Sequence, residues 1–312
     1  MKHNIQITII LLVMFIVTQL IGLAVINAYS PRQEIIFNQT TGQYENVTIT
    51  PQLPYGMQPP EISPTASLAS IVIAMVIAIA LIFLLTRIKA ALFLRLWFFF
   101  VVIIALGITM NAVLFNFTAY SPYIALIIAL PLAFFKIFKR SLLVHNITEL
   151  MIYPGIATVF VPILNIWVIV VLLLLISVYD IYAVWHSKIM EKMAKFQINK
   201  LKIFTGFFVP YIDKKTRLAL KQAKGKKGKG KKVKVNLAIL GGGDVVFPLI
   251  TAGVVLVSLG LIPALFISVF STIALLLLFV YARKGKFYPA MPFLTAGCLL
   301  GLLLAYLYTF LI

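Results

Sequence analysis

The sequence predicts an all-α polytopic membrane protein with nine transmembrane helices, and three observations lead to that fold class. Of 312 residues, 62% are hydrophobic and only 11% are charged, and the mean hydropathy is +1.07. A soluble domain has about 25% charged residues and about 45–50% apolar ones, so the composition excludes an ordinary soluble protein. The apolar residues form runs of about 20, the length that a helix needs to cross a bilayer core of about 30 Å. The loops between these runs alternate between basic and uncharged or mixed.

Nine segments are long and apolar enough to be such helices. The fifth and sixth are interrupted by Pro162 and Asn165. A continuous helix over 147–186 would be about 60 Å long, about twice the membrane thickness, so a break is expected there. The first segment has about 24 apolar residues, more than the roughly 7–15 of a cleavable signal peptide, and is expected to be retained. The predicted spans are residues 5–28, 66–86, 92–114, 121–138, 147–163, 165–186, 237–257, 262–281 and 288–311.

Charges in the loops predict the orientation. The loops at 115–120 and 258–261 have no charge, whereas every second loop is basic. Because basic loops stay in the cytoplasm, the N-terminus is expected there and the C-terminus outside. We expect a multi-pass protein of the cell membrane of a prokaryote. The basic loops contain Arg87 and Lys89; Lys136, Lys139 and Arg140; the long segment 187–236; and Arg283, Lys284 and Lys286.

The segment 187–236 separates a six-helix part, residues 1–186, from a three-helix part, residues 237–312. It contains 16 Lys and Arg residues and two acids, and therefore most of the net charge of +19. Its low-complexity Lys/Gly sequence predicts disorder and attraction to anionic lipid headgroups, not to nucleic acid. Residues 203–212 are apolar but too short to span, which predicts an interfacial or re-entrant segment.

Only eight residues are acidic, so each can be placed individually. Five lie in the two long loops, and Glu149 is expected near the start of the fifth helix, where a carboxylate suits the positive helix end. Asp180 and Asp244 remain, inside apolar sequence of the sixth and seventh spans. An aspartate there costs about 2.5–3.5 kcal/mol on insertion, so both are functional candidates. Counted at 1.5 Å per residue, they lie about 9 and 12 Å from the cytoplasmic helix ends, on antiparallel helices.

Two carboxyl groups at matched depth suggest two functions. Close carboxyls in a low-dielectric site share one proton. The ionised member can then take a proton from water while the protonated member donates to the carbonyl of a peptide bond, which hydrolyses the bond. Paired carboxyls also serve as proton relays or cation sites in channels and transporters. The carboxyls alone leave protease and cation leak channel or transporter open.

The neighbouring residues favour the protease. Gly241-Gly242-Gly243 directly precedes Asp244 and exposes main chain, to which an extended peptide could add as a strand. Tyr179 precedes Asp180 and could offer a phenolic hydrogen bond. The ninth span opens with Pro289-Ala290-Met291-Pro292, whose two prolines keep the first turn irregular. Three unusual segments are therefore expected at one depth.

Tyr179-Asp180, Gly241-Gly242-Gly243-Asp244 and Pro289-Ala290-Met291 resemble the YD, GxGD and PAL motifs of the presenilin and signal peptide peptidase family of intramembrane aspartyl proteases. The resemblance covers the whole chain: nine helices, motifs on the sixth, seventh and ninth, and a long loop between the sixth and seventh. The cytoplasmic N-terminus resembles presenilins, and archaeal presenilin homologues are the most similar.

The resemblance implies that Asp180 and Asp244 are the catalytic pair of an aspartic endopeptidase. It implies that Pro289, Ala290 and Met291 shape the site, and that the substrates are transmembrane segments of other proteins. Met291 stands where the family has Leu, a swap of similar volume. Residues 203–212 lie where presenilins have a cleavable plug; self-cleavage, homo-oligomerisation and accessory subunits stay open.

Other hydrolase chemistries lack their residues. The sequence has no H-E-x-x-H and no G-x-S-x-G pattern. His3, His145 and His186 are far apart, and each is expected to be an interfacial or loop residue. Neither a metal nor a cofactor is therefore expected.

Overall fold

A computed structural model describes residues 5–38, 43–57, 91–139, 141–186, 205–211, 236–282 and 288–311, with helical pieces at 68–70, 72–74, 76–77 and 80–81. Within this part of the chain, eight helices are long and apolar enough to cross a membrane. The all-α polytopic class is thus confirmed. The second predicted span, 66–86, lies mostly outside the described residues. The helices are α1 (Ile5–Tyr29), α3 (Ala91–Leu114), α4 (Ser121–Phe138), α5 (Leu142–Phe160), α6 (Ile166–Trp185), α9 (Gly242–Leu259), α10 (Leu261–Tyr281) and α11 (Met291–Leu311).

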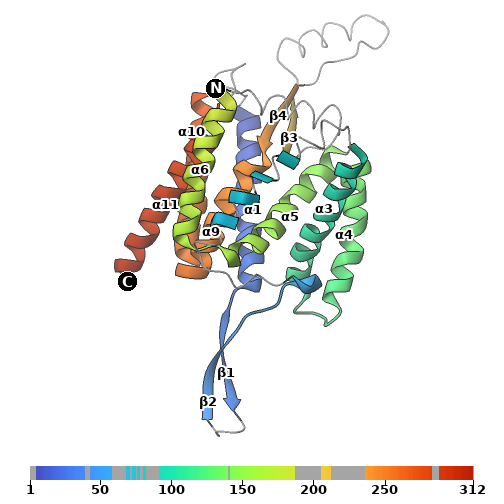
Figure 1. The fold of residues 1–312 in the computed structure, drawn as a ribbon, viewed down its shortest axis with the longest axis vertical. Coiled ribbons are helices and arrows are strands. Elements are labelled where there is room, and N and C mark those ends of the chain that lie inside the picture. The colour runs from blue at the N-terminus through green and yellow to red at the C-terminus, as the bar shows by residue number, and fades with distance from the viewer. Residues whose placement is uncertain are drawn as a thin grey trace, which may run out of the picture.

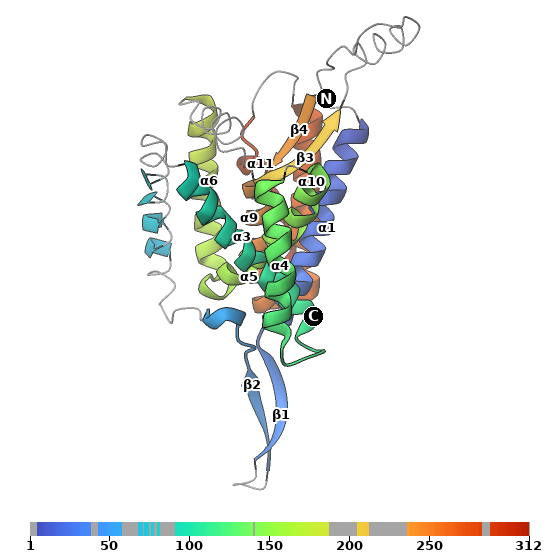
Figure 2. The ribbon, with the colours of Figure 1, turned by 90° about the vertical axis from the view of Figure 1, so that its right-hand side faces the viewer.

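The helices run roughly along one axis, with a small sheet at each end of the bundle (Figures 1 and 2). Strands β1 (Arg32–Asn38) and β2 (Gln43–Ile49) form an antiparallel hairpin that projects from one end. The 3₁₀ helix η1 (Pro54–Gly56) follows it. Strands β3 (Gly206–Tyr211) and β4 (Asn236–Gly241) lie at the other end, near the N-terminus, whereas the C-terminus lies at the hairpin end (Figure 1). The sequence predicted only a loop where the hairpin forms.

The expected break between the fifth and sixth spans is present. The 3₁₀ helix η2 (Val161–Ile163) ends α5, and Asn165 caps the next helix by accepting a hydrogen bond from the Val168 N–H at 2.8 Å. Asparagine satisfies one of the free donors of a helix start in this way. Helix α5 itself begins at residue 142, five residues earlier than predicted.

The start of the seventh span was predicted wrongly. Residues 236–241 form strand β4 (Asn236–Gly241), which pairs antiparallel with β3 (Gly206–Tyr211) in a register that places Gly206 opposite Gly241. The segment 203–212 was expected to be interfacial or re-entrant. Its residues 206–211 form this strand, and 203, 204 and 212 lie outside the described residues. Phe207 and Leu240 are buried in the helical core, whereas Ile239 is exposed, so one face of the sheet packs against the bundle.

Helix α9 forms the centre of the bundle and contacts α1, α5, α6, α10 and α11. Its buried residues join the main hydrophobic cluster together with side chains of α1, α5, α6, α10 and α11. A second cluster is formed mainly by α3, α4 and α5. Helix α5 belongs to both clusters and thereby connects the two halves of the bundle.

Gly155 on α5 allows that helix to approach α3 closely. A Cβ atom at this position would collide with the backbone carbonyl of Ala105. We expect Gly155→Ala to lower the free energy of unfolding by about 1–3 kcal/mol, because backbone cannot yield as a side chain does. Gly243→Ala is the matched control, since its Cβ would have no neighbour within 3.8 Å. Thermal unfolding in detergent measures both; an unchanged midpoint for Gly155→Ala would contradict the close approach.

Candidate active site

Asp180 lies on the buried face of α6, where its side chain is only 4% exposed. Its Oδ2 atom accepts a hydrogen bond from the backbone N–H of Met291 at 3.0 Å. Met291 is the first residue of α11, and the first N–H groups of a helix have no partner within the helix. The helix start therefore supplies a donor to the carboxyl group.

A second polar contact holds α6 against α11 one turn from Asp180. The hydroxyl groups of Ser177 and Thr295 are 2.7 Å apart, and Thr295 Oγ1 also donates to the carbonyl of Leu173 at 3.3 Å. Both side chains are buried. Sequence reasoning missed this pair, although small polar residues three before Asp180 and four after Met291 in apolar helices were a usable indication.

Asp244 is the third residue of α9, directly after the end of β4. A Cβ atom on Gly241 would lie 3.0 Å from Asp244 Oδ2, so glycine there leaves room for the carboxyl group. The carboxyls of Asp180 and Asp244 are close enough to interact electrostatically. The predicted depth of Asp244 counted eight helical residues, and that count is wrong because residues 236–241 are extended.

The other two glycines before Asp244 have different surroundings. Gly242 is buried, and a Cβ there would lie 2.9 Å from the hydroxyl oxygen of Tyr153 on α5. Gly243 is exposed, and a Cβ there would meet only the ring of Phe247 at 3.8 Å, an ordinary van der Waals distance. Main chain beside Asp244 is therefore exposed at Gly243 and partly exposed at Gly241, but not at Gly242, whereas the sequence predicted accessible main chain at all three.

The remaining predicted site residues lie next to Asp180 in the sequence or at the start of α11. Pro289 is buried, and Ala290 and Pro292 are half-buried at the start of α11. Ala290 accepts the N–H of Leu294 at 3.1 Å and so caps the helix. Tyr179 is half-buried on a different side of α6 from Asp180, because adjacent helical residues lie about 100° apart.

Glu149 does not lie at a water-accessible helix end, as the sequence suggested. It is fully buried in the second turn of α5, and its Oε1 atom is 2.6 Å from Nζ of Lys136 on α4. His145, expected to be a plain interfacial residue, bonds through Nε2 to the carbonyl of Gly206 at 2.8 Å. His145 and Glu149 also lie 3.6 Å apart, Nε2 to Oε1, four residues apart on α5, and this spacing could be read from the sequence. Their partners Lys136 and Gly206 come from other elements, so no local pattern indicated those two contacts.

Gln19 of α1 is a further polar residue that sequence reasoning missed. It is buried, and its Nε2 donates to the carbonyl of Val245 at 3.1 Å, one residue after Asp244. Among the described residues, Oε1 of Gln19, Oε2 of Glu149 and the Tyr153 hydroxyl are buried without a hydrogen-bond partner. The start of α9 is thus enclosed by polar groups from α1 and α5.

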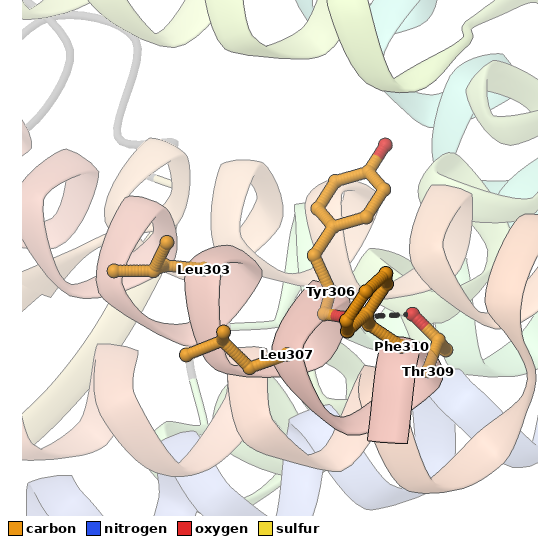
Figure 3. Close-up of a pocket in the computed structure, with 5 residues that line it drawn as sticks. All are labelled: Leu303, Tyr306, Leu307, Thr309 and Phe310. Atoms are coloured by element: carbon orange, nitrogen blue, oxygen red, sulfur yellow. Dashed lines mark hydrogen bonds between the residues drawn. The ribbon is translucent and has the colours of Figure 1, made fainter. Parts of the chain in front are cut away.

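Within the described part of the chain, no group of three or more His, Cys, Asp or Glu residues could hold a metal ion. The pair of carboxyls is suited to acid–base chemistry. A shallow apolar hollow elsewhere is lined by Leu303, Tyr306, Leu307, Thr309 and Phe310 (Figure 3). It lies toward the opposite end of α11 from Met291, about 18–30 Å along the helix, and is not part of this site.

Comparisons with known proteins agree with the geometry. A model of the family described as "Signal-peptide peptidase, presenilin aspartyl protease" matches residues 50–311. Two solved structures of "a presenilin family intramembrane aspartate protease", in C222 and P2 crystals, share the fold. The first has a TM-score of 0.60 at 20% identity and covers 96% of this chain and 99% of its own. The second has a TM-score of 0.58 at 20% identity, with 96% of each chain covered. Among curated proteins, none matches the sequence.

Proposed function

Since the chain belongs to the signal-peptide peptidase and presenilin aspartyl protease family, we propose that Asp180 and Asp244 hydrolyse peptide bonds within transmembrane segments of other membrane proteins. Proteins of this family are intramembrane aspartyl proteases, which are hydrolases. The chain is therefore a hydrolase of that class, and it is a multi-pass membrane protein. Family membership favours this function over the transporter that the carboxyls alone left open. The observation that supports the proposal most is the electrostatic interaction between Asp180, which is buried, and Asp244, which is half-buried.

Asp180 acts as the general base in this mechanism, because the N–H that Met291 donates to its carboxyl favours the ionised form. It takes a proton from water as the water oxygen bonds to the carbonyl carbon. Asp244 donates its proton to the carbonyl oxygen, which gives a neutral tetrahedral diol. Collapse of the diol returns a proton to Asp244, passes one to the leaving nitrogen and breaks the C–N bond.

The substrate must be extended where it is cut, since helical hydrogen bonds and side chains shield the peptide groups of an intact helix. The exposed main chain at Gly243 supports approach of such an extended peptide to Asp244. A peptide that adds as a strand to β4, which ends at Gly241 just before this point, would have its carbonyl groups fixed by main-chain hydrogen bonds. The chemical class of substrate is therefore an apolar, single-span peptide with a locally unwound segment.

Three further expectations remain proposals. The β3–β4 end of the bundle faces the cytoplasm, as the basic loops predict. The loop 187–236 contacts anionic lipid headgroups; it lies almost entirely outside the described residues. The host membrane is the cell membrane of a prokaryote.

Incubation of the purified protein with a synthetic single-span peptide in lipid vesicles tests the function. Mass spectrometry should find fragments cut inside the apolar segment. A hydroxyl-containing transition-state analogue of aspartyl proteases should suppress these fragments, while a metal chelator or a serine-protease inhibitor should leave them unchanged. Fragments that persist at saturating analogue would contradict an aspartyl mechanism.

A further inference from the structure

Helix α5 presents polar side chains to the outer edge of β3. Asn146 makes two hydrogen bonds with Phe208: its Nδ2 donates to the carbonyl at 2.8 Å, and the Phe208 N–H donates to Oδ1 at 3.0 Å. At Gly206, the carbonyl bonds to Nε2 of His145 and the N–H donates to Oε1 of Glu149 at 3.4 Å. All backbone polar groups of residues 206 and 208 are thus bonded to α5, which takes the place of a neighbouring strand.

Lys136 of α4 anchors these side chains. Its Nζ contacts Glu149 Oε1 at 2.6 Å and His145 Nδ1 at 3.4 Å. Because Nδ1 accepts from the ammonium group, Nε2 carries the proton that is donated to Gly206. The Lys136 and Glu149 side chains are 3% and 0% exposed, so neither charge can turn to solvent if the contact is broken. We name Lys136, His145, Asn146 and Glu149 the α5 clamp.

The clamp is connected to the candidate catalytic aspartate by main-chain pairing. Gly206, which the clamp holds on its outer side, lies opposite Gly241 in β4. The Gly242 N–H donates to the carbonyl of Thr205 at 3.3 Å, so the pairing continues into the first residue of α9. Asp244 follows two residues later, with its Oδ2 beside Gly241. A shift of β3 along β4 would therefore move the start of α9.

The register of β3 against β4 is not secured by the strands alone. They are six residues long, and Gly206 and Gly241 have no side chains with which to pack. A slip by two residues would keep the same side chains on the same face, so burial alone does not prevent it. Asn146 and His145 prevent such a slip, because their hydrogen bonds go to the backbone of Phe208 and Gly206.

We propose that the α5 clamp is a positioning device for the protease: it fixes β3, and through β4 it sets the place of Asp244 and of the peptide bond that is cut. The inference rests on the proposed function. His145, Asn146 and Glu149 act through the strand and are positioning residues, since they touch neither Asp180 nor Asp244.

If the α5 clamp positions Asp244, its loss should change both the bonds that are cut and the rate of cleavage. Asn146→Ala removes two hydrogen bonds to β3, and we expect kcat to fall about tenfold or more, on the order expected for two such bonds. We also expect the cuts in one single-span peptide to spread to neighbouring bonds. Mass spectrometry of the fragments gives both quantities. Asn146→Asp keeps the acceptor for the Phe208 N–H and should give an intermediate spread.

Asn111→Ala is the matched control. Asn111 is buried, whereas Asn146 is half-buried, and the Asn111 Nδ2 donates to the Tyr29 hydroxyl at 2.9 Å, away from the β3–β4 sheet. Its loss should lower the thermal midpoint without moving the cuts. The inference is overturned if Asn146→Ala and Asn146→Asp cut at the wild-type bonds and lose kcat only in proportion to the unfolded fraction. If the wild-type protein cuts nothing, the proposed function itself has failed.

Glu149→Gln keeps an acceptor for Lys136 and Gly206 but removes the negative charge, which covers the case in which Asn146→Ala does not fold. Lys136 then lies buried without a counter-charge among the described groups of the clamp. For Glu149→Gln we expect the cuts to spread less than for Asn146→Ala. The double variant Lys136→Met/Glu149→Gln removes the unpaired charge, so its kcat should be higher than that of Glu149→Gln alone. Wild-type cuts in Glu149→Gln together with an unaltered kcat would contradict a role for the ion pair.

Discussion

Asp180→Asn and Asp244→Asn are each expected to abolish cleavage of a transmembrane reporter peptide. An amide cannot take a proton from water, and it leaves the second carboxyl without the partner that shares its proton. Loss of one general acid or base is worth about 10²–10⁴-fold in rate. Because the two groups act as a unit, the double variant should be about as slow as either single variant. Mass spectrometry of the fragments at equal enzyme concentration measures the rate.

The same substitutions should leave the protein folded. A buried carboxyl is costly to keep in an apolar interior, and the isosteric amide removes that cost. The thermal midpoint is therefore expected to stay equal or to rise. Glu34→Gln, an exposed position on β1 at the other end of the bundle, is the control and should cleave at the wild-type rate. Cleavage by either aspartate variant at about a tenth of the wild-type rate or more would contradict the assignment of the pair.

Helices in this chain could be predicted from the sequence because the bilayer imposes their length. Eight of the nine predicted spans correspond to described helices that begin or end within a few residues of the expected positions. The start of α9 was predicted as helix but is preceded by a strand, because the short apolar run 237–240 fits a strand as well as a helix. What decides for the strand is pairing with Gly206, 35 residues earlier, and no local pattern reports such a partner.

Only those residues of the candidate site could be predicted whose type is unusual for their place in the sequence. Asp180 and Asp244 were conspicuous because acids are rare in apolar sequence. Glu149 was misjudged because a charge near a helix end is usually solvated, and its partner Lys136 had been assigned to a cytoplasmic loop. The Met291 N–H could not be predicted as a donor to Asp180, since the two residues are 111 positions apart in the sequence. Contacts between elements decide which polar residues serve the site.

Met291→Pro is expected to lower kcat strongly by removing a single backbone N–H. Met291 begins α11, where proline fits the helix and no intrahelical bond is lost. The change removes the 3.0 Å hydrogen bond to Asp180 Oδ2. Hydrogen bonds to charged groups are worth about 1.5–3 kcal/mol, which corresponds to about a tenfold to hundredfold fall in rate. Initial rates with the reporter peptide at saturating concentration measure the effect.

Two variants at the same position separate the N–H from the side chain. Met291→Ala keeps the donor and removes the buried side chain, whereas Met291→Leu keeps the donor and nearly the same volume. We expect Met291→Leu to cleave at about the wild-type rate and Met291→Ala to lose stability more than kcat. The ratio of the Ala and Pro rates then isolates the backbone donor. Equal rates for Met291→Ala and Met291→Pro would mean that this donor does not hold Asp180 in its catalytic form, and the assignment of Asp180 as the base would fall with it.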